Sequence, residues 1–519
     1  MGSRTFRLAL LGCLILVSLP GEQRSAHPAP LRFLITFDPR VSPVPFTGRV
    51  YLTVSRKPPE ELPSRTNWFT PEPFFATDVN GLRPGQPCVI DGHAPGFPVP
   101  LSLLARGTYS VQAFLDFDRG EQSFTVAEGN GCSRPVRLEL DPRTGGTMSL
   151  VIDRTVPKRI FPETQRVRLV ELPSKLLSRF HGRPVLLRAG VVLPGSFATH
   201  PEKRYPVIYQ IPHFSGDHFG ALAAAQRGVT EVAGVEMLYV VLDPSCRWGH
   251  HAFADSSNNG PWAQALTEEL IPFIERKYRG LGTPAGRLLT GQSSGGWSSL
   301  WLQISYPDFF GGVWAVVPDP VDFRDFQRIN IYHPRTNMYL DERGQPRPLA
   351  RRKGQPFLYY KPFADMERVM GHGGQLGSFD AVFGPRGPDG GPQPLWDHQT
   401  GQIDPVVAQH WARYDIRKVL EEKWTRVRSS LQGKLHIYAA GEDDFYLEGA
   451  VKLLAATLRH LNADAEVQIF PHRGHSTVLD EELQTHIARE MAARFHESSR
   501  TSGSVAGPEP VPSIPGKEP

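Results

Sequence analysis

Cysteine, excess charge of either sign and long apolar runs are all scarce in this sequence. Only 4 of its 519 residues are cysteine, and none has the CxxC spacing of a zinc site or redox motif. The 57 Lys+Arg and 53 Asp+Glu residues leave a net charge of +4, which excludes a nucleic-acid-binding protein held by a broad basic field. No segment reaches the ~20 consecutive apolar residues of a membrane-spanning helix. We therefore expect no nucleic-acid partner and no transmembrane segment in the mature chain.

The first 26 residues have the pattern of a secretory signal. A basic start at residues 1–7 precedes an almost entirely apolar run at residues 8–19, which is too short for a membrane span. We therefore predict a signal peptide over residues 1–26 and a secreted or periplasmic protein. Cys13 offers lipoprotein anchoring as a less favoured alternative, because the apolar run continues after it, where a lipoprotein turns polar.

Removal of that signal would leave three cysteines, Cys88, Cys132 and Cys246. Export permits disulfides, so Cys88 and Cys132 could pair within the N-terminal region. Three buried thiols are the equally weighted alternative.

The composition and patterning predict two folded regions. Residues 28–155 alternate apolar and polar positions in short runs separated by turns, which indicates a β-sandwich-like domain. From 160 to 497, buried strand-like runs alternate with helical ones, which indicates a doubly wound, mostly parallel sheet. Residues 320–410, rich in Pro, Gly, Arg and aromatics, interrupt this alternation and predict an ordered insertion near the site. Residues 498–519 read as a disordered tail.

The sequence Gly291-Gln-Ser293-Ser-Gly295 is the most informative motif. It has the form GxSxG, follows a short apolar strand and precedes a helical run. In this arrangement the serine sits on a tight turn between strand and helix, and the glycines avoid collisions with neighbouring backbone. The pattern predicts Ser293 as a nucleophile, with the backbone N–H of Ser294 facing an oxyanion.

A serine nucleophile needs a base that is oriented by an acid, and in this fold the order along the chain is serine, acid, histidine. An acidic run follows the predicted strand at residues 434–440, at the carboxyl end where such groups collect. His475 comes after a glycine and before the last helix, and we expect it to be the base; His472 is the alternative.

A second oxyanion donor is expected from the loop after the predicted strand at residues 205–211. The backbone of His213 or Phe214 would supply it. No cofactor or metal is expected, because the histidines lack HExxH or Cys/His zinc spacing. The histidines considered were His213, His218, His250, His251, His472 and His475.

Four segments together resemble the esterase family of α/β-hydrolases that includes enterochelin esterases, S-formylglutathione hydrolases, feruloyl esterases and mycolyltransferases. These are residues 204–209, 291–296, 441–447 and 474–475, and the resemblance covers about 160–497. It implies the α/β-hydrolase fold, Ser293 as nucleophile and His475 as base. It also implies Asp443 as the acid, with Asp444 as the alternative. Where the family usually carries His-Gly after the early strand, this chain has Pro212-His213.

These observations predict an exported serine esterase acting on a small-molecule or polysaccharide-linked ester. Two alternatives stay open. The same three groups could transfer the acyl group to a sugar or lipid hydroxyl, or the chain could be a non-catalytic binding protein on a hydrolase scaffold.

Overall fold

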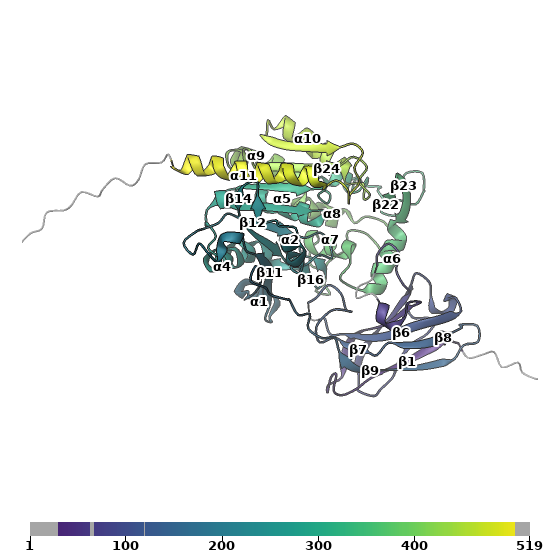
Figure 1. Cartoon of the computed structure of the whole chain (residues 1–519). Helices are drawn as coiled ribbons and strands as arrows, with labels where there is room; N and C mark the ends of the chain where they lie inside the picture. Colours follow the sequence, from purple (N-terminus) through teal and green to yellow (C-terminus); the bar gives the residue numbers. More distant parts are fainter. Residues whose placement is uncertain (1–29, 63–66, 119, 504–519) are drawn as a thin grey trace, which may run out of the picture.

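A computed structural model describes residues 30–62, 67–118 and 120–503. The predicted signal peptide, Cys13 and residues 504–519 lie outside this part of the chain. An N-terminal β-rich region and a larger α/β region lie side by side, with helix α6 (Tyr360–Met370) next to the N-terminal strands (Figure 1).

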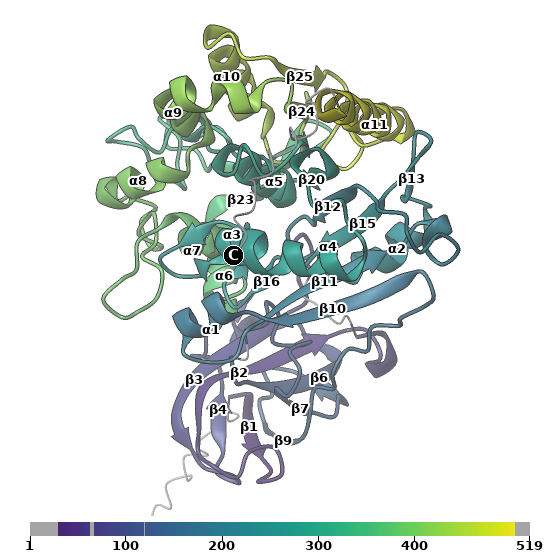
Figure 2. The same ribbon diagram turned by 90° about the vertical axis from the view of Figure 1, so that its left-hand side faces the viewer.

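Residues 30–155 form strands and short 3-10 turns, with no α-helix among the described positions. The strands join one mixed sheet of order β4-β1-β9-β7-β6-β2-β3-β5, with β8 paired to β6. Alternate side chains of these strands point inward and form a separate apolar core. The strands themselves are the purple and blue layer in Figure 2. The strands are β1 (Arg32–Phe37), β2 (Phe46–Ser55), β3 (Phe74–Leu82), β4 (Cys88–Ile90), β5 (Gly96–Phe97), β6 (Gly107–Asp116), β7 (Gly131–Ser133), β8 (Val136–Leu140) and β9 (Thr147–Thr155).

An eight-stranded sheet organises the rest of the chain, in the order β10-β11-β15-β12-β20-β21-β24-β25. The pairs β10–β11 and β11–β15 are antiparallel, and every later pair is parallel. The strands are β10 (Val167–Pro173), β11 (Leu186–Val192), β12 (Val207–Ile211), β15 (Leu238–Leu242), β20 (Arg287–Gln292), β21 (Gly312–Val316), β24 (Leu435–Ala440) and β25 (Ala465–Phe470). Short two-residue strands form three hairpins beside the sheet: β13 (Glu231–Val232) with β14 (Val235–Glu236), β16 (Ser245–Cys246) with β17 (Gly249–His250), and β18 (Asp255–Ser256) with β19 (Gly260–Pro261).

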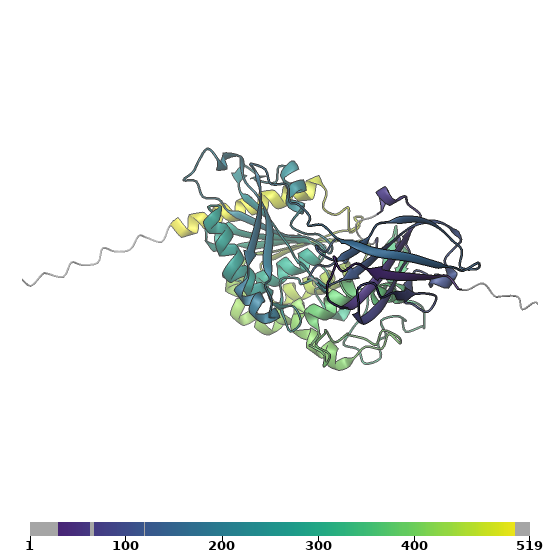
Figure 3. The ribbon, with the colours of Figure 1, turned by 90° about the horizontal axis from the view of Figure 1, so that it is seen from below.

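Helices cover both faces of this sheet (Figure 3). On one face α2 and α11 pack against strand residues such as Val241 and Leu288, and on the other α3–α5, α9 and α10 pack against residues such as Leu289 and Ile437. Apolar side chains on both faces explain why the strands read as continuous apolar runs in the sequence. The helices are α1 (Lys175–His181), α2 (Gly220–Gln226), α3 (Trp262–Ala265), α4 (Ile271–Lys277), α5 (Ser294–Ser305), α9 (Ile416–Leu431), α10 (Glu448–His460) and α11 (Glu481–Gly503).

The segment predicted as an insertion is ordered and has its own elements. They are a hairpin of β22 (Pro348–Arg352) and β23 (Gln355–Tyr359), then α6, α7 (Gln375–Phe383) and α8 (Pro405–Trp411). Buried aromatic rings, including Phe323, Phe383 and Trp411, pack against one another and join this segment to the main core.

A π-helical turn at Leu266–Leu270 joins α3 to α4, just before Pro272, whose ring nitrogen cannot donate the usual helical hydrogen bond. Helix α11 continues to Gly503, past the predicted start of the tail. Cys88, Cys132 and Cys246 are buried free thiols, so no Cys88–Cys132 disulfide is formed.

Candidate active site

Ser293 occupies a strained turn between β20 and α5. Its backbone has φ 58° and ψ −124°, a conformation that residues with a side chain rarely adopt. The two glycines of the motif are required by space: a Cβ at Gly291 would lie 2.2 Å from the Gly295 carbonyl oxygen, and one at Gly295 would lie 2.0 Å from that of Ile211. The turn therefore lifts the Ser293 side chain out of the sheet at the carboxyl end of β20.

Asp443 and His475 come together at the ends of the two neighbouring late strands. His475 Nδ1 lies 2.8 Å from Asp443 Oδ2, and the Asp443 side chain is fully buried. Asp443 Oδ1 accepts a hydrogen bond from the backbone N–H of Phe445 at 2.8 Å, which fixes the carboxylate. Asp444 instead accepts from the backbone N–H of His475 at 3.0 Å. Asp444, the predicted alternative acid, therefore binds the backbone of the His475 loop. Among the described residues, it makes no hydrogen bond to the nitrogens of the imidazole.

His472, the alternative base, points away from this group. Its side chain is 92% exposed and lies near Glu442. Gln292, the residue before Ser293, donates from Nε2 to the backbone carbonyl of His475 at 3.0 Å. The serine turn and the His475 loop are therefore tied directly to each other.

A residue that sequence reasoning missed, Asp319, lies beside Ser293. The Ser293 hydroxyl donates to Asp319 Oδ1 at 3.3 Å, while Asp319 Oδ2 accepts from Ser294 Oγ at 2.6 Å and from Gln375 Nε2 at 3.3 Å. Within the described chain, Ser293 and His475 share no hydrogen bond. Asp319 comes shortly after β21, at the same sheet edge as the other site residues, and this position is the signal that could have identified it.

The electrostatic surroundings shift the pKa values of both groups near Ser293. Burial lowers the pKa of His475, but the charge and hydrogen bond of Asp443, with further contributions from Asp319 and Asp444, outweigh burial and raise it above its usual value. Burial raises the pKa of Asp319 to about 6, opposed in part by its hydrogen bond with Ser294 and by His475. Asp319 is 6% exposed, so little water screens its charge.

The predicted oxyanion donors lie next to the serine. Ser294 is the first residue of α5, and the first N–H groups of a helix have no partner within it. His213 and Phe214 directly follow β12 and line the same cavity as Ser293, and His213 Nδ1 donates to the Phe214 carbonyl oxygen at 2.7 Å. Both residues therefore line the cavity although the chain has Pro212-His213 where the family pattern has His-Gly.

Ser293 and His475 open into a cavity of about 580 Å³. Three parts of the chain line it: the α/β core, the insertion and the N-terminal region. Most of the lining is apolar, and the described residues that form it include no Lys or Arg. The aromatic lining residues are Trp68, Phe69, Phe124, Phe214, Phe363, Phe379 and Phe445. No sequence pattern indicated that Trp68 and Phe69 would reach this cavity, because only the folded chain brings them there.

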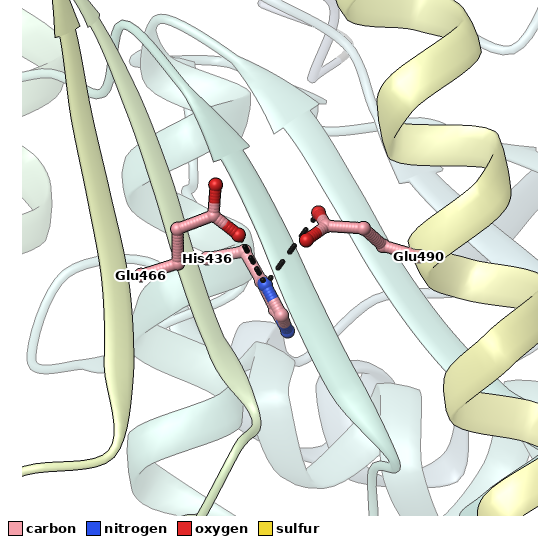
Figure 4. Close-up of side chains that lie close together, drawn as sticks. All are labelled: His436, Glu466 and Glu490. Atoms are coloured by element: carbon pink, nitrogen blue, oxygen red, sulfur yellow. Dashed lines mark hydrogen bonds and ion pairs between the residues drawn. The ribbon is translucent and has the colours of Figure 1, made fainter.

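A second group of titratable side chains lies at the start of β24 and β25 and on α11 (Figure 4). His436 Nδ1 is 3.4 Å from Glu466 and 3.6 Å from Glu490, and Glu490 also accepts from Trp314 Nε1 at 3.1 Å. The spacing of the three residues could accept a metal ion. Their contacts with one another already pair them, so the cluster links α11 to the sheet without one.

The sheet order, the strand-turn-helix serine and the acid and histidine after the last two strands define the α/β-hydrolase class. Within that class, the family described as "Putative esterase" matches residues 187–480, more than half of the chain, and the protein belongs to that family.

No curated protein matches the sequence significantly. Among solved structures, a ferulic acid esterase is 15% identical and covers 64% of this chain and 98% of its own, with a TM-score of 0.41. An S-formylglutathione hydrolase from Agrobacterium tumefaciens is 13% identical over 63% and 95% of the two chains, with a TM-score of 0.38. The serine hydrolase FphF of Staphylococcus aureus is 10% identical over 63% and 98%, with a TM-score of 0.39. No described helix is long and apolar enough to cross a membrane.

Proposed function

We propose that the protein is a serine carboxylic-ester hydrolase in which Ser293 is the nucleophile, His475 the base and Asp443 the acid. The observation that carries the proposal is the His475–Asp443 contact of 2.8 Å, with His475 lining the same cavity as Ser293 on its strained turn. The surroundings of the three groups suit these roles: a hydroxyl that lines the cavity, an imidazole hydrogen-bonded to a carboxylate, and a buried carboxylate.

In the proposed reaction Ser293 turns from Asp319 toward His475 Nε2, which takes its proton as Oγ attacks the ester carbonyl carbon. The N–H of Ser294, with that of His213 or Phe214, binds the developing oxyanion. The imidazolium then protonates the leaving alcohol as its C–O bond breaks, and an acyl-enzyme remains. Water adds to the acyl carbon with His475 again as base, which releases the acid and restores Ser293.

The cavity favours a bulky ester. Its volume of about 580 Å³ and its aromatic lining fit a substrate with an extended apolar or aromatic portion, either a small molecule or the ester-bearing end of a polysaccharide. We further infer that residues 28–155 form a β-sandwich-like domain, that 160–497 form the hydrolase domain, and that the protein is exported.

Replacement of Ser293 by Ala tests the assignment. We expect loss of p-nitrophenyl ester hydrolysis and of labelling by a fluorophosphonate probe, while the melting temperature stays within a few degrees of the parent. Ser429→Ala is the matched control, because Ser429 is exposed on α9, and it should label and hydrolyse normally. Full activity of Ser293→Ala would disprove the proposal, and a parent protein that neither labels nor hydrolyses would support a binding protein on the hydrolase scaffold.

A further inference from the structure

Asp319 lines the cavity, and its carboxylate oxygen Oδ1 is only weakly hydrogen-bonded. Its Oδ2 accepts a short hydrogen bond from Ser294 Oγ, at 2.6 Å, and a longer one from Gln375 Nε2, at 3.3 Å. Among the described residues, its Oδ1 has one hydrogen bond, a long contact of 3.3 Å with the Ser293 hydroxyl. When Ser293 turns toward His475, Oδ1 loses that donor and a buried carboxylate oxygen is left facing the substrate.

The lining of the cavity supplies no cation to balance this carboxylate. Among the described residues that line the cavity there is no Lys or Arg, and the nitrogen bases are His213, His372 and His475. His372 is paired with Asp116 at 3.1 Å, and His475 is held by Asp443. Behind Asp319, His250 is fully buried, and burial lowers its pKa to about 4, so it stays neutral. A buried carboxylate without a counter-ion is costly, and a cationic substrate would remove that cost.

The position of Oδ1 identifies the part of the substrate that can reach it. The leaving alcohol must lie near His475, which protonates it, whereas the acyl group stays bonded to Ser293. A substituent on the carbon next to the carbonyl is three bonds from Ser293 Oγ, or about 3 Å away in space. Asp319 Oδ1 lies 3.3 Å from the same Oγ, so a substituent on the Asp319 side of Oγ comes within hydrogen-bond distance of it.

Building on the proposed esterase function, we propose that Asp319 anchors a subsite for a protonated amine on the acyl group. The enzyme would then prefer esters of α-amino acids to esters of uncharged acids of the same size. Gln375, from the start of α7, positions the carboxylate through its contacts with Ser294 Oγ at 3.1 Å and with Asp319 Oδ2.

Three 2-naphthyl esters with the same three-carbon acyl skeleton test this subsite: those of alanine, lactic acid and propionic acid. For the parent protein at pH 7 we expect kcat/KM for the alanine ester to exceed that for the propionate ester by about tenfold or more, with the lactate ester between them. Asp319→Asn should reduce the alanine-to-propionate ratio to within about twofold of unity, because the side chain keeps its size but loses its charge. Gln375→Ala, which removes the positioning contact, should lower the ratio less.

Glu367→Gln is the matched control, because Glu367 is another carboxylate that is largely shielded from solvent, but it caps the start of α7 and does not line the cavity. Its alanine-to-propionate ratio should equal the parent's. A parent ratio near unity, or a ratio that Asp319→Asn leaves unchanged, would overturn the subsite. If the propionate ester is cleaved in a Ser293-dependent way in either case, the esterase function stands and only the subsite fails. If no ester is cleaved and no fluorophosphonate label is taken up, the esterase function itself fails.

Discussion

Two carboxylates near Ser293 make different contacts. Asp443 is hydrogen-bonded to His475, whereas Asp319 contacts the serine hydroxyl directly. Both negative charges also act on the imidazole and raise its pKa against the opposing effect of burial. The ionisation of His475 therefore reports on both acids.

This arrangement predicts a pH dependence. A base must be neutral to accept the proton of Ser293, so kcat/KM should fall as the pH decreases through the raised pKa of His475. Asp319→Asn removes one negative charge that raises this pKa. The midpoint of the acid limb should then move to lower pH, as measured on an uncharged ester. A midpoint that stays in place or rises would contradict the electrostatic account, and Glu367→Gln again serves as the control.

At the scale of elements, the site depends on how closely β20 and α5 approach the neighbouring strands. Gly295 lies against the end of β12. A Cβ added at Gly296 would lie 2.8 Å from the carbonyl oxygen of Val316, the last residue of β21. The helix can start at Ser294 only because these positions carry no side chain. The same close packing places the N-terminus of α5 beside the loop after β12.

Gly295→Ala should therefore disrupt the turn. Its Cβ would lie 2.0 Å from the Ile211 carbonyl oxygen and 2.7 Å from that of Pro212, and both are backbone atoms that cannot move aside. We expect destabilisation by about 2 kcal/mol or more, seen as a lower melting temperature, together with loss of fluorophosphonate labelling. Gly377→Ala is the control, because Gly377 lies within α7 and the nearest atom outside that helix to an added Cβ, Glu367 Oε2, is 3.8 Å away; the substitution should be neutral or slightly stabilising. Parent-like melting of Gly295→Ala would contradict the steric argument.

For the whole molecule, two loops of the N-terminal region, the one between β2 and β3 and the one between β6 and β7, form part of the cavity wall. Trp68 packs against Phe214 of the oxyanion loop with ring centres 4.7 Å apart, and Phe69 packs against Phe445, which follows Asp443, at 6.1 Å. Contacts with α6 hold the two regions together: Arg49 Nη1 donates to the Arg368 carbonyl oxygen at 3.0 Å, and Tyr51 donates to that of Met370. The N-terminal region is thus placed to influence which esters enter.

Trp68→Ala tests this influence. Loss of a large aromatic surface from the cavity should lower kcat/KM for a bulky naphthyl ester by about tenfold, and lower that for p-nitrophenyl acetate much less, because the small ester does not extend to Trp68. Leu103→Ala, which removes a side chain that is 70% exposed in the same region, should change neither value. Equal losses on both esters would indicate a general structural effect instead of substrate contact.

The sequence alone determined the alternation of strands and helices, because apolar strands buried on both faces form a local pattern. It also determined the residues expected at the site, because GxSxG and the order serine–acid–histidine can be recognised along the chain. The pairing of Asp443, and not Asp444, with the His475 imidazole was decided by tertiary structure, since adjacent residues in one turn point in different directions. Tertiary structure alone also brought Asp319 to Ser293 and Trp68 to the cavity. These contacts join residues far apart in the chain, and no local periodicity records which distant segments will pack together.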